Sequence, residues 1–201
     1  MLENRIRELH AAGRFPEAAT VAIEGYGPEI FSFLRISLCN QADAEDVFGI
    51  ACIDLWNGIC DFRFECTFRT WAYLVARRAQ ARFTRKESPY RAQDALSAIP
   101  YLSELEARVR TATRPYLQSA LKSSVLKLRE QLAPDEQMLL LLRVDRDLPW
   151  LDVARVMATA DGVEVNDATL TRVAATYRKQ FERTVAKLRH LAEAHGLLSE
   201  T

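Results

Sequence analysis

The sequence predicts an all-α protein with two small helical domains joined by a linker. Apolar residues recur at spacings of three and four along most of the chain, whereas the alternation typical of strands is hard to find. Of the 201 residues, 49% are hydrophobic and 27% are charged, so the chain can bury a core and is not disordered. Three prolines and several Ser and Thr residues interrupt the periodicity between 86 and 120. We therefore expect domains at 1–85 and 121–201, and a linker at 86–120 that contains a short helix around Ser103 to Arg110.

The first 38 residues predict three helices. Apolar residues on both sides of Gly13 indicate two short helices within 1–25. Gly25, Gly27 and Pro28 are expected to break the chain, because Gly and Pro disfavour a helix interior. The apolar stretch 28–38 then predicts a new helix with proline in its first turn, where a missing N–H is tolerated.

The next helix is predicted from Asp43 to about Gly58. Carboxylates in its first turn favour the unpaired N–H groups there. One face is apolar at fourfold spacing and should enter the core. A second face carries Asp46 and Asp54 outward. The apolar face comprises Val47, Ala51, Leu55 and Ile59.

An aromatic loop and a basic helix follow. Phe62, Phe64, Phe68 and Trp71 crowd the loop, and all but Phe64 are expected in the core. From 69 to 91 there are seven basic residues and one acidic residue. The formal net charge of zero argues against a protein that binds nucleic acid over its whole surface. The clustering of basic residues at 69–91 nevertheless suits local contact with phosphate groups.

The second half predicts a helix-turn-helix unit. Two helices are expected on either side of Pro134, within 121–144, and Pro149 is placed to open another. That next helix should turn three apolar residues inward, and a long final helix capped by Asn166 or Asp167 should follow a loop. The predicted inward residues within 121–144 are Val125, Leu128, Leu132, Met138, Leu141, Leu142 and Val144. Those of the helix after Pro149 are Leu151, Ala154 and Met157. The predicted seam of the last helix is Leu170, Ala174, Tyr177, Phe181, Val185, Leu188 and Leu191.

Several classes of protein are not expected. The N-terminus lacks the continuous apolar run of a signal peptide, and no run of about 18 apolar residues occurs, so we expect a cytoplasmic protein with no membrane span. The four cysteines form no C-x-x-C pair and are expected to be reduced, mostly buried thiols. No metal site, cofactor site or catalytic motif is apparent, which predicts a protein that is not an enzyme.

Residues 43–83 resemble region 2 of bacterial RNA polymerase sigma factors, of the extracytoplasmic-function kind (group IV of the sigma-70 family). The resemblance is carried by DAED, by DLW, by the pattern F-R-x-x-x-x-F-R-T-W over 62–71, and by Tyr73 with the arginines after it. Two positions depart from the family. Gly49 and Ile50 replace the usual Gln-Glu, and Phe64 occupies a loop position that is often Gly.

The resemblance implies two binding surfaces in the first domain. The acidic helix would dock on core RNA polymerase, and the loop with the basic helix would hold a flipped base and the opened strand of the promoter −10 element. The implied core-binding residues are Asp43, Glu45, Asp46, Asp54 and Trp56. The implied −10 residues are Phe64, Glu65, Cys66, Thr67, Arg77, Arg78 and Arg82.

The second half resembles sigma region 4, which implies contact with the −35 element in the major groove. Two registers are open for the recognition helix. One aligns Ala168 to Leu170 with the family's G-T-V, and the other aligns the segment that begins at Ala175. The second is preferred here and requires an insertion between Met157 and Ala175. Its implied −35 residues are Thr176, Arg178, Lys179 and Arg183.

These resemblances predict a sigma factor whose partners are core RNA polymerase and promoter DNA, with an anti-sigma factor as a further partner usual in the family. Two other interpretations stay open. In the first, the chain is a stand-alone helix-turn-helix regulator that binds duplex DNA without polymerase. In the second, it is a helical protein-interaction scaffold that neither binds duplex DNA nor works with polymerase.

Overall fold

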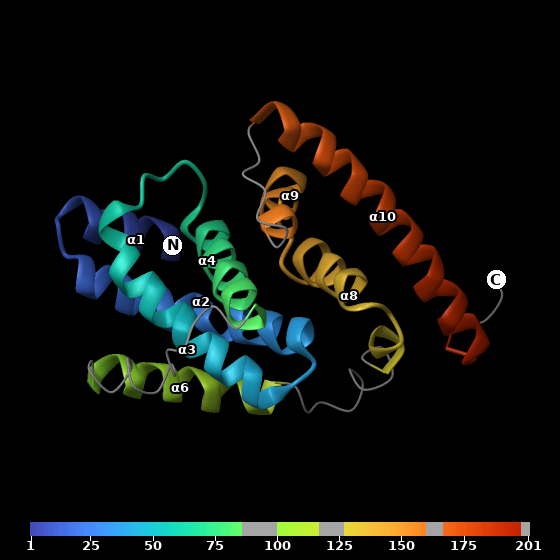
Figure 1. Ribbon diagram of the computed structural model, residues 1–201, viewed down its shortest axis with the longest axis horizontal. Helices are drawn as coiled ribbons and strands as arrows, with labels where there is room; N and C mark the ends of the chain where they lie inside the picture. The colour runs from blue at the N-terminus through green and yellow to red at the C-terminus, as the bar shows by residue number, and fades with distance from the viewer. Residues whose placement is uncertain (86–99, 117–126, 160–166, 198–201) are drawn as a thin grey trace. The chain divides into compact units, whose positions relative to one another are not determined.

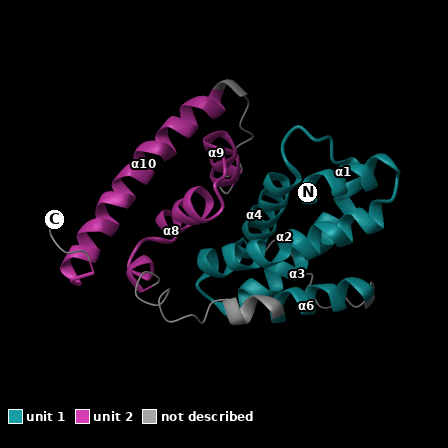
Figure 2. Cartoon of the chain, turned by 180° about the vertical axis from the view of Figure 1, so that it is seen from behind, with its two compact units in different colours: residues 1–114 teal, residues 115–201 magenta. Residues whose placement is uncertain are grey.

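The computed structural model describes residues 1–85, 100–116, 127–159 and 167–197, and in these ranges it contains helices and no strand (Figure 1). The predicted all-α fold class is therefore confirmed. The chain divides into two compact units, residues 1–114 and residues 115–201 (Figure 2).

Four long helices form the core of the first unit, and a fifth covers them. Large side chains that are fully buried, such as Phe33, Phe48 and Tyr73, come from three different helices. The elements are α1 (Leu2–Ala11), α2 (Phe15–Leu38), α3 (Gln41–Gly58), η1 (Ile59–Asp61), α4 (Phe68–Thr84) and α6 (Pro100–Tyr116).

Helix α2 is continuous through Pro28, so the predicted break at Gly25–Pro28 is wrong. The proline removes one helical N–H, a local cost that would favour a break in isolation. Here the surrounding turns are buried, including Gly27 and Ile30, and most helical stability in proteins comes from such packing. Ser32 Oγ also donates a hydrogen bond of 2.8 Å to the Pro28 carbonyl. Tertiary contacts therefore override the local signal.

Helix α3 buries the face that its spacing predicts. Val47, Ala51, Leu55 and the following Ile59 are all buried. The helix begins one residue after Asn40, whose side-chain oxygen accepts hydrogen bonds from the Ala42 and Asp43 N–H groups. The N-cap of α3 is therefore the Asn40 side-chain amide, and the acidic residues follow it in the first turns of the helix.

Helix α6 lies in the range where the sequence predicts a linker. The short helix expected at Ser103 to Arg110 is part of this longer helix. Leu102, Leu105 and Val109 are buried, and the first compact unit extends to residue 114. The described part of the predicted linker therefore packs largely with the first unit; residues 86–99 and 117–120 lie outside the described residues.

The second unit is a set of short helices closed by a long one. Its elements are α8 (Pro134–Leu140), η2 (Leu141–Asp145, a π-helical segment), α9 (Trp150–Ala158) and α10 (Asp167–Ala194). Glu136 Oε2 accepts a 2.8 Å hydrogen bond from the Ala133 N–H and pairs at 2.8 Å with Lys187 Nζ, which ties the start of α8 to α10. Val125 and Asn166 lie outside the described residues.

Two predicted inward residues of this unit are exposed. Leu151 is 48% exposed because the buried face of α9 is centred on Val153 and Met157, which leaves Leu151 at its edge. Val144 is 54% exposed, and it lies in η2, where the wider π-helical turns no longer follow the 3.6-residue spacing. Leu170 and Ala174 of the predicted α10 seam are buried, and the other five members are half-buried.

Candidate functional site

The loop between η1 and α4 packs on a cluster of aromatic rings. Phe62 is 7% exposed, and its ring centroid lies 4.9 Å from that of Trp71 and 5.4 Å from that of Phe68. Phe68 is fully buried, and Trp71 is half-buried. The prediction that these three rings belong to the core is confirmed for the two phenylalanines and holds in part for Trp71.

Phe64 takes a left-handed backbone conformation, with φ of 56°. This region favours glycine, so a residue with a Cβ atom is strained at this position. Its ring is held by helix α1, because the Arg7 guanidinium lies 4.7 Å above the ring and the His10 ring lies 5.0 Å away at its edge. His10 is itself fixed by a 2.9 Å hydrogen bond between Nε2 and the Ile59 carbonyl oxygen.

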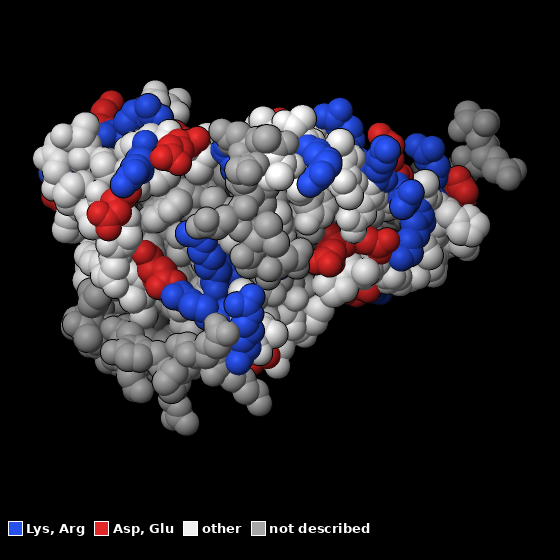
Figure 3. Space-filling view, turned by 45° about the horizontal axis from the view of Figure 1, so that its top comes forward, with Lys and Arg blue, Asp and Glu red and all other residues white. Residues whose placement is uncertain are grey.

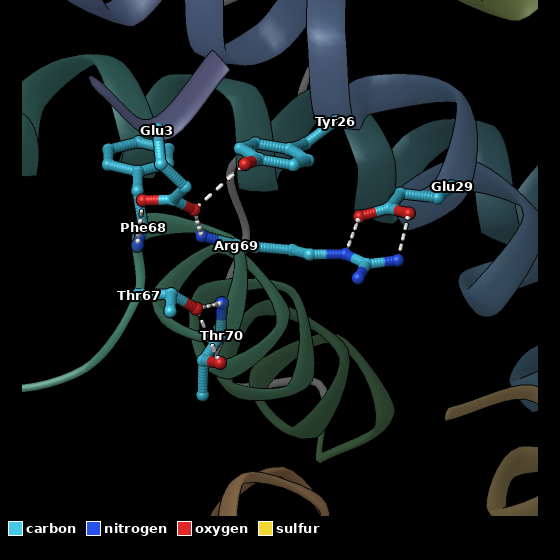
Figure 4. Close-up of polar contacts among 7 residues, drawn as sticks. All are labelled: Glu3, Tyr26, Glu29, Thr67, Phe68, Arg69 and Thr70. Atoms are coloured by element: carbon cyan, nitrogen blue, oxygen red, sulfur yellow. Dashed lines mark hydrogen bonds and ion pairs between the residues drawn. The ribbon is translucent and has the colours of Figure 1, made fainter. Parts of the chain in front are cut away.

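The start of α4 is fixed by groups from α1 and α2 and by its own N-cap residue (Figure 4). The Glu3 carboxylate of α1 accepts hydrogen bonds from the Phe68 N–H at 3.0 Å and the Arg69 N–H at 2.9 Å. The same carboxylate accepts a 2.8 Å hydrogen bond from the Tyr26 hydroxyl, and burial together with this bond raises the pKa of Tyr26 well above its usual value. A carboxylate at this position satisfies N–H groups that have no partner within the helix.

Side chains within α4 and α2 complete this arrangement. Thr67 caps α4, since its Oγ1 accepts a 3.1 Å hydrogen bond from the Thr70 N–H. Arg69 makes a two-pronged contact with Glu29 of α2, at 2.7 and 2.8 Å. The sequence reasoning missed both glutamates, because Glu3 precedes its partners by 65 and 66 residues and no local pattern marks it.

The rim of the loop faces solvent. Glu65 and Thr67 are exposed, and Phe64 and Cys66 are half-buried. Polar groups able to meet the edge of a nucleotide base are therefore accessible, whereas the Phe62 and Phe68 rings beneath them are buried. The loop is not sealed inside the helical bundle.

The three predicted phosphate-binding arginines of α4 have different environments. Arg77 is 6% exposed and donates hydrogen bonds to Ser37 Oγ at 3.4 Å and Gln80 Oε1 at 3.1 Å. Arg78 is exposed. Arg82 is exposed and pairs with Asp54 of α3. Arg77 is therefore placed to hold the helices together, whereas the other two face solvent.

The acidic residues of α3 are partly engaged by neighbouring helices. Asp46 is exposed, and Asp43 is half-buried. Glu45 pairs with Arg110 of α6 at 3.0 Å. Burial raises the pKa of Asp54, and its pairing with Arg82 opposes that rise. Trp56 is half-buried, with its ring 6.4 Å from the Tyr101 ring of α6.

In the second unit, the predicted −35 residues form an exposed surface on α10. Thr176, Arg178, Lys179 and Arg183 are all exposed. The opposite side of α10 packs on α9, where Leu170 and Ala174 cluster with Ala154. Arg178 lies 5.5 Å above the Trp150 ring, so its direction is constrained by α9.

The start of α10 bears on the two registers. The helix begins at Asp167, which places Ala168 to Leu170 in its first turn and the segment from Ala175 two turns later. Arg172 lies between them and is exposed. It was not among the residues selected from the sequence, because the preferred register starts after it.

Other features limit the kinds of site that the described residues hold. No group of three or more His, Cys, Asp or Glu side chains suited to a metal ion occurs among them. None of the described helices is both long and apolar enough to cross a membrane. On the face seen in Figure 3, acidic and basic side chains are intermixed.

The four cysteines are free thiols, but they are not mostly buried as predicted. Cys39 and Cys60 are exposed, Cys66 is half-buried and only Cys52 is buried. Cys39 follows the end of α2 and Cys60 lies in η1, so neither is on the core face of a long helix. Burial raises the pKa of the Cys52 thiol well above its usual value.

Comparison with known families places the first unit. Residues 22–89 match the family model described as Sigma-70 region 2, whereas none of the curated proteins matches the chain. The matched range contains most of α2 and all of α3, the aromatic loop and α4. It supports a sigma-70 family sigma factor, a non-enzymatic protein that works with core RNA polymerase and promoter DNA. Residues 22–89 are therefore similar to a sigma-70 region 2 domain, which supports a role in promoter recognition and melting.

Proposed function

We propose that this chain is a sigma factor of the extracytoplasmic-function type, which binds core RNA polymerase and directs it to promoters through their −10 and −35 elements. The observation that carries the proposal is the loop at 62–67. Within the range that matches region 2, a fixed cluster of aromatic rings supports an exposed polar rim. Such a rim suits the capture of a single unpaired base.

The −10 step would work by holding a base that has left the duplex. Opening a duplex costs several kcal/mol, and stacking on an aromatic ring offsets about 1–3 kcal/mol per base. Glu65, Cys66 and Thr67 would contact the base edge, with Phe64 as the aromatic wall once Arg7 moves aside. Arg78 and Arg82 would hold phosphates. Arg77 would act as a positioning residue, because its guanidinium is buried between α2 and α4.

The acidic surface of α3 would dock on the polymerase. Asp46 is exposed, so its carboxylate is accessible to a basic partner surface. Asp43 would add to the same surface. Glu45 and Asp54 would exchange their present arginine partners for groups on the polymerase, and Trp56 would contribute an apolar edge.

The surface of α10 would enter the major groove at the −35 element. In helix-turn-helix proteins, residues near the N-terminus of the second helix contact base edges. The start of α10 at Asp167 therefore supports the first register, with Arg172 and Thr176 close to the bases. Arg178, Lys179 and Arg183 would then contact phosphates or more distant bases. In the second register, Arg178 itself would contact a base edge.

Run-off transcription with purified core polymerase tests the proposal. A promoter-dependent product is expected only when the protein is added. A stand-alone helix-turn-helix regulator would shift duplex DNA without polymerase and give no such product. A helical protein-interaction scaffold would do neither. An anti-sigma factor remains a proposed partner, to be sought by co-purification once the transcription assay is positive.

The Asp46→Lys variant tests the docking surface. Because Asp46 is exposed, the substitution should leave the fold intact while reversing the charge presented to the polymerase. We expect weaker holoenzyme assembly in a titration of the variant against core enzyme. The matched control is Asp61→Lys, at an exposed acidic residue outside α3. Equal assembly by both variants would contradict docking through Asp46.

A further inference from the structure

Helix α6 covers part of the surface that we propose for polymerase docking. Arg110 of α6 pairs with Glu45 at 3.0 Å, and the Tyr101 ring lies 6.4 Å from the Trp56 ring. Two of the five proposed docking residues are thus engaged by α6. Figure 1 shows α6 running alongside α3 within the first unit.

An apolar contact with α2 fixes the position of α6. A Cβ atom added to Gly27 would lie 2.8 Å from Val109 Cγ1, so the two helices are in close contact at this glycine. Val109 is 5% exposed, and Leu102 and Leu105 are fully buried. An ion pair of 2.8 Å between Arg108 and Glu24 adds a second contact with α2 at the surface.

The polar part of the α6 contact is less favourable. Glu106 is 4% exposed and pairs with Arg110 at 2.8 Å. Burial, and after it the nearby carboxylates of Glu45 and Asp46 on α3, raise the pKa of Glu106 to about 7 against the attraction of Arg110. Arg110 thus pairs with two carboxylates, those of Glu45 and Glu106, and the second of these is shielded from water. A buried charge with incomplete compensation weakens a contact, so α6 is held less firmly than an apolar helix would be.

We propose that α6 is an autoinhibitory helix, which occupies the polymerase-docking surface of α3 and has to leave it before core enzyme binds. Arg110 supplies a cation to Glu45, and a basic surface of the polymerase would replace it there. Glu45 and Trp56 cannot contact α6 and the polymerase at the same time. The inference rests on the proposed function, because it presupposes that α3 is the docking surface.

The first experiment measures the affinity of the full chain for core enzyme after α6 is loosened. Val109→Asp introduces a carboxylate against Gly27, and we expect it to bind core about tenfold more tightly, which corresponds to about 1.4 kcal/mol. Val109 is not among the proposed docking residues. Circular dichroism and thermal unfolding of the same variant verify that α1 to α4 remain folded.

A charge exchange avoids any change to the core. Arg108→Glu should raise core affinity by about two- to fivefold, the range expected for an exposed ion pair. Adding Glu24→Arg restores an opposite-charge pair and should return the affinity to that of the wild type. The single variant Glu24→Arg separates release of α6 from a simple effect of net charge. It breaks the same ion pair and should also raise core affinity, although it changes the net charge by +2 whereas Arg108→Glu changes it by −2.

The second experiment measures amide hydrogen exchange of the wild-type chain, alone and in holoenzyme. Amides at 100–114 should exchange faster in the holoenzyme, while those of α3 become more protected. If α6 stays protected in a holoenzyme that forms, or if both α6 variants bind core no better than the wild type, autoinhibition is refuted and the proposed function stands. If neither wild type nor variants bind core, the proposed function fails and this inference fails with it.

Discussion

The start of α4 is held by groups distant in the sequence, whereas the candidate binding residues on α10 contact their own helix or the neighbouring α9. Glu3 and Glu29 reach the first turn of α4 from α1 and α2. On α10, Thr176 Oγ1 donates to the carbonyl of Arg172, one turn earlier, and Arg178 lies over the Trp150 ring of α9. Substitutions near α4 should therefore alter the shape of the loop as well as its contacts. Substitutions on the exposed face of α10 should alter binding alone.

The largest expected effect is a contrast in pH dependence between the two units. Burial raises the pKa of Glu106 in the first unit from 4.5 to about 7. A raised carboxyl pKa means that its contribution to stability is fully present below about pH 4.5 and is lost as the pH rises through 7. At about 1.4 kcal/mol per pKa unit, the rise from 4.5 to about 7 corresponds to a loss of at most about 3.5 kcal/mol. Urea unfolding of the first unit at pH 5 and pH 8 should show it, and Glu106→Gln should remove it.

Glu136 in the second unit provides the opposite case. Its hydrogen bond from Lys187 lowers the pKa, so the stability that it contributes is present above about pH 4.5 and is lost as the pH falls further. Glu136→Gln should leave the difference between pH 5 and pH 8 unchanged. If the Glu106→Gln variant shows the same difference in stability between pH 5 and pH 8 as the wild type, the pH dependence comes from another group.

Glu3→Ala is expected to destabilise the first unit by about 2–3 kcal/mol, because hydrogen bonds to a charged group contribute more than neutral ones and a helix cap is lost with them. The variant should also weaken binding of a single-stranded −10 oligonucleotide by holoenzyme, since the loop would no longer be fixed. Thermal unfolding and an oligonucleotide titration measure the two effects. Glu8→Ala is the matched control, at an exposed glutamate of the same helix. Equal stability of the two variants would show that the Glu3 contacts are not needed.

The sequence predicts features that depend on local spacing. The fourfold repeat from Val47 to Leu55 correctly indicates the buried face of α3, and the clustered rings around Phe62 correctly indicate a core. Both signals lie within one helix or one loop. The same is true of Pro149, which immediately precedes α9 as expected.

Features that depend on distant contacts were missed or misread. Pro28 indicates a break that packing overrides, and Glu3 carries no sign of its partners 65 residues away. Arg77 stands in a row of arginines, but contacts with Ser37 make it a buried residue. The packing of α6 on α2 is equally non-local, since Gly27 and Val109 are neighbours only in the folded chain.

A pair of arginine variants tests the α10 side of the comparison. If the first register is correct, Arg172→Ala should weaken binding of holoenzyme to −35 DNA by about 1–3 kcal/mol and relax sequence preference, whereas Arg178→Ala should weaken all sequences alike. The second register predicts the reverse. Both residues are exposed, so thermal stability should change little. Arg189→Ala, at an exposed position near the end of α10, is the control and should change neither property.

The smallest effect concerns the backbone of the loop. Phe64 has φ of 56°, where a residue with a Cβ atom is strained by about 1 kcal/mol relative to glycine. Phe64→Gly and Phe64→Ala both lose the ring contacts with Arg7 and His10, but only glycine relaxes the backbone. We therefore expect Phe64→Gly to be the more stable of the two by about 1 kcal/mol in urea unfolding.

Asp147 in the second unit, with φ of 51° and its side chain 90% exposed, provides the matched pair. Asp147→Gly and Asp147→Ala should differ by a similar amount, because the backbone term is the same and both variants lack the aspartate's ion pair with Arg143. A much smaller difference at Phe64 than at Asp147 would mean that the loop relaxes once the ring is removed. In that case the aromatic contacts with α1, rather than the chain on either side, hold Phe64 in its left-handed conformation.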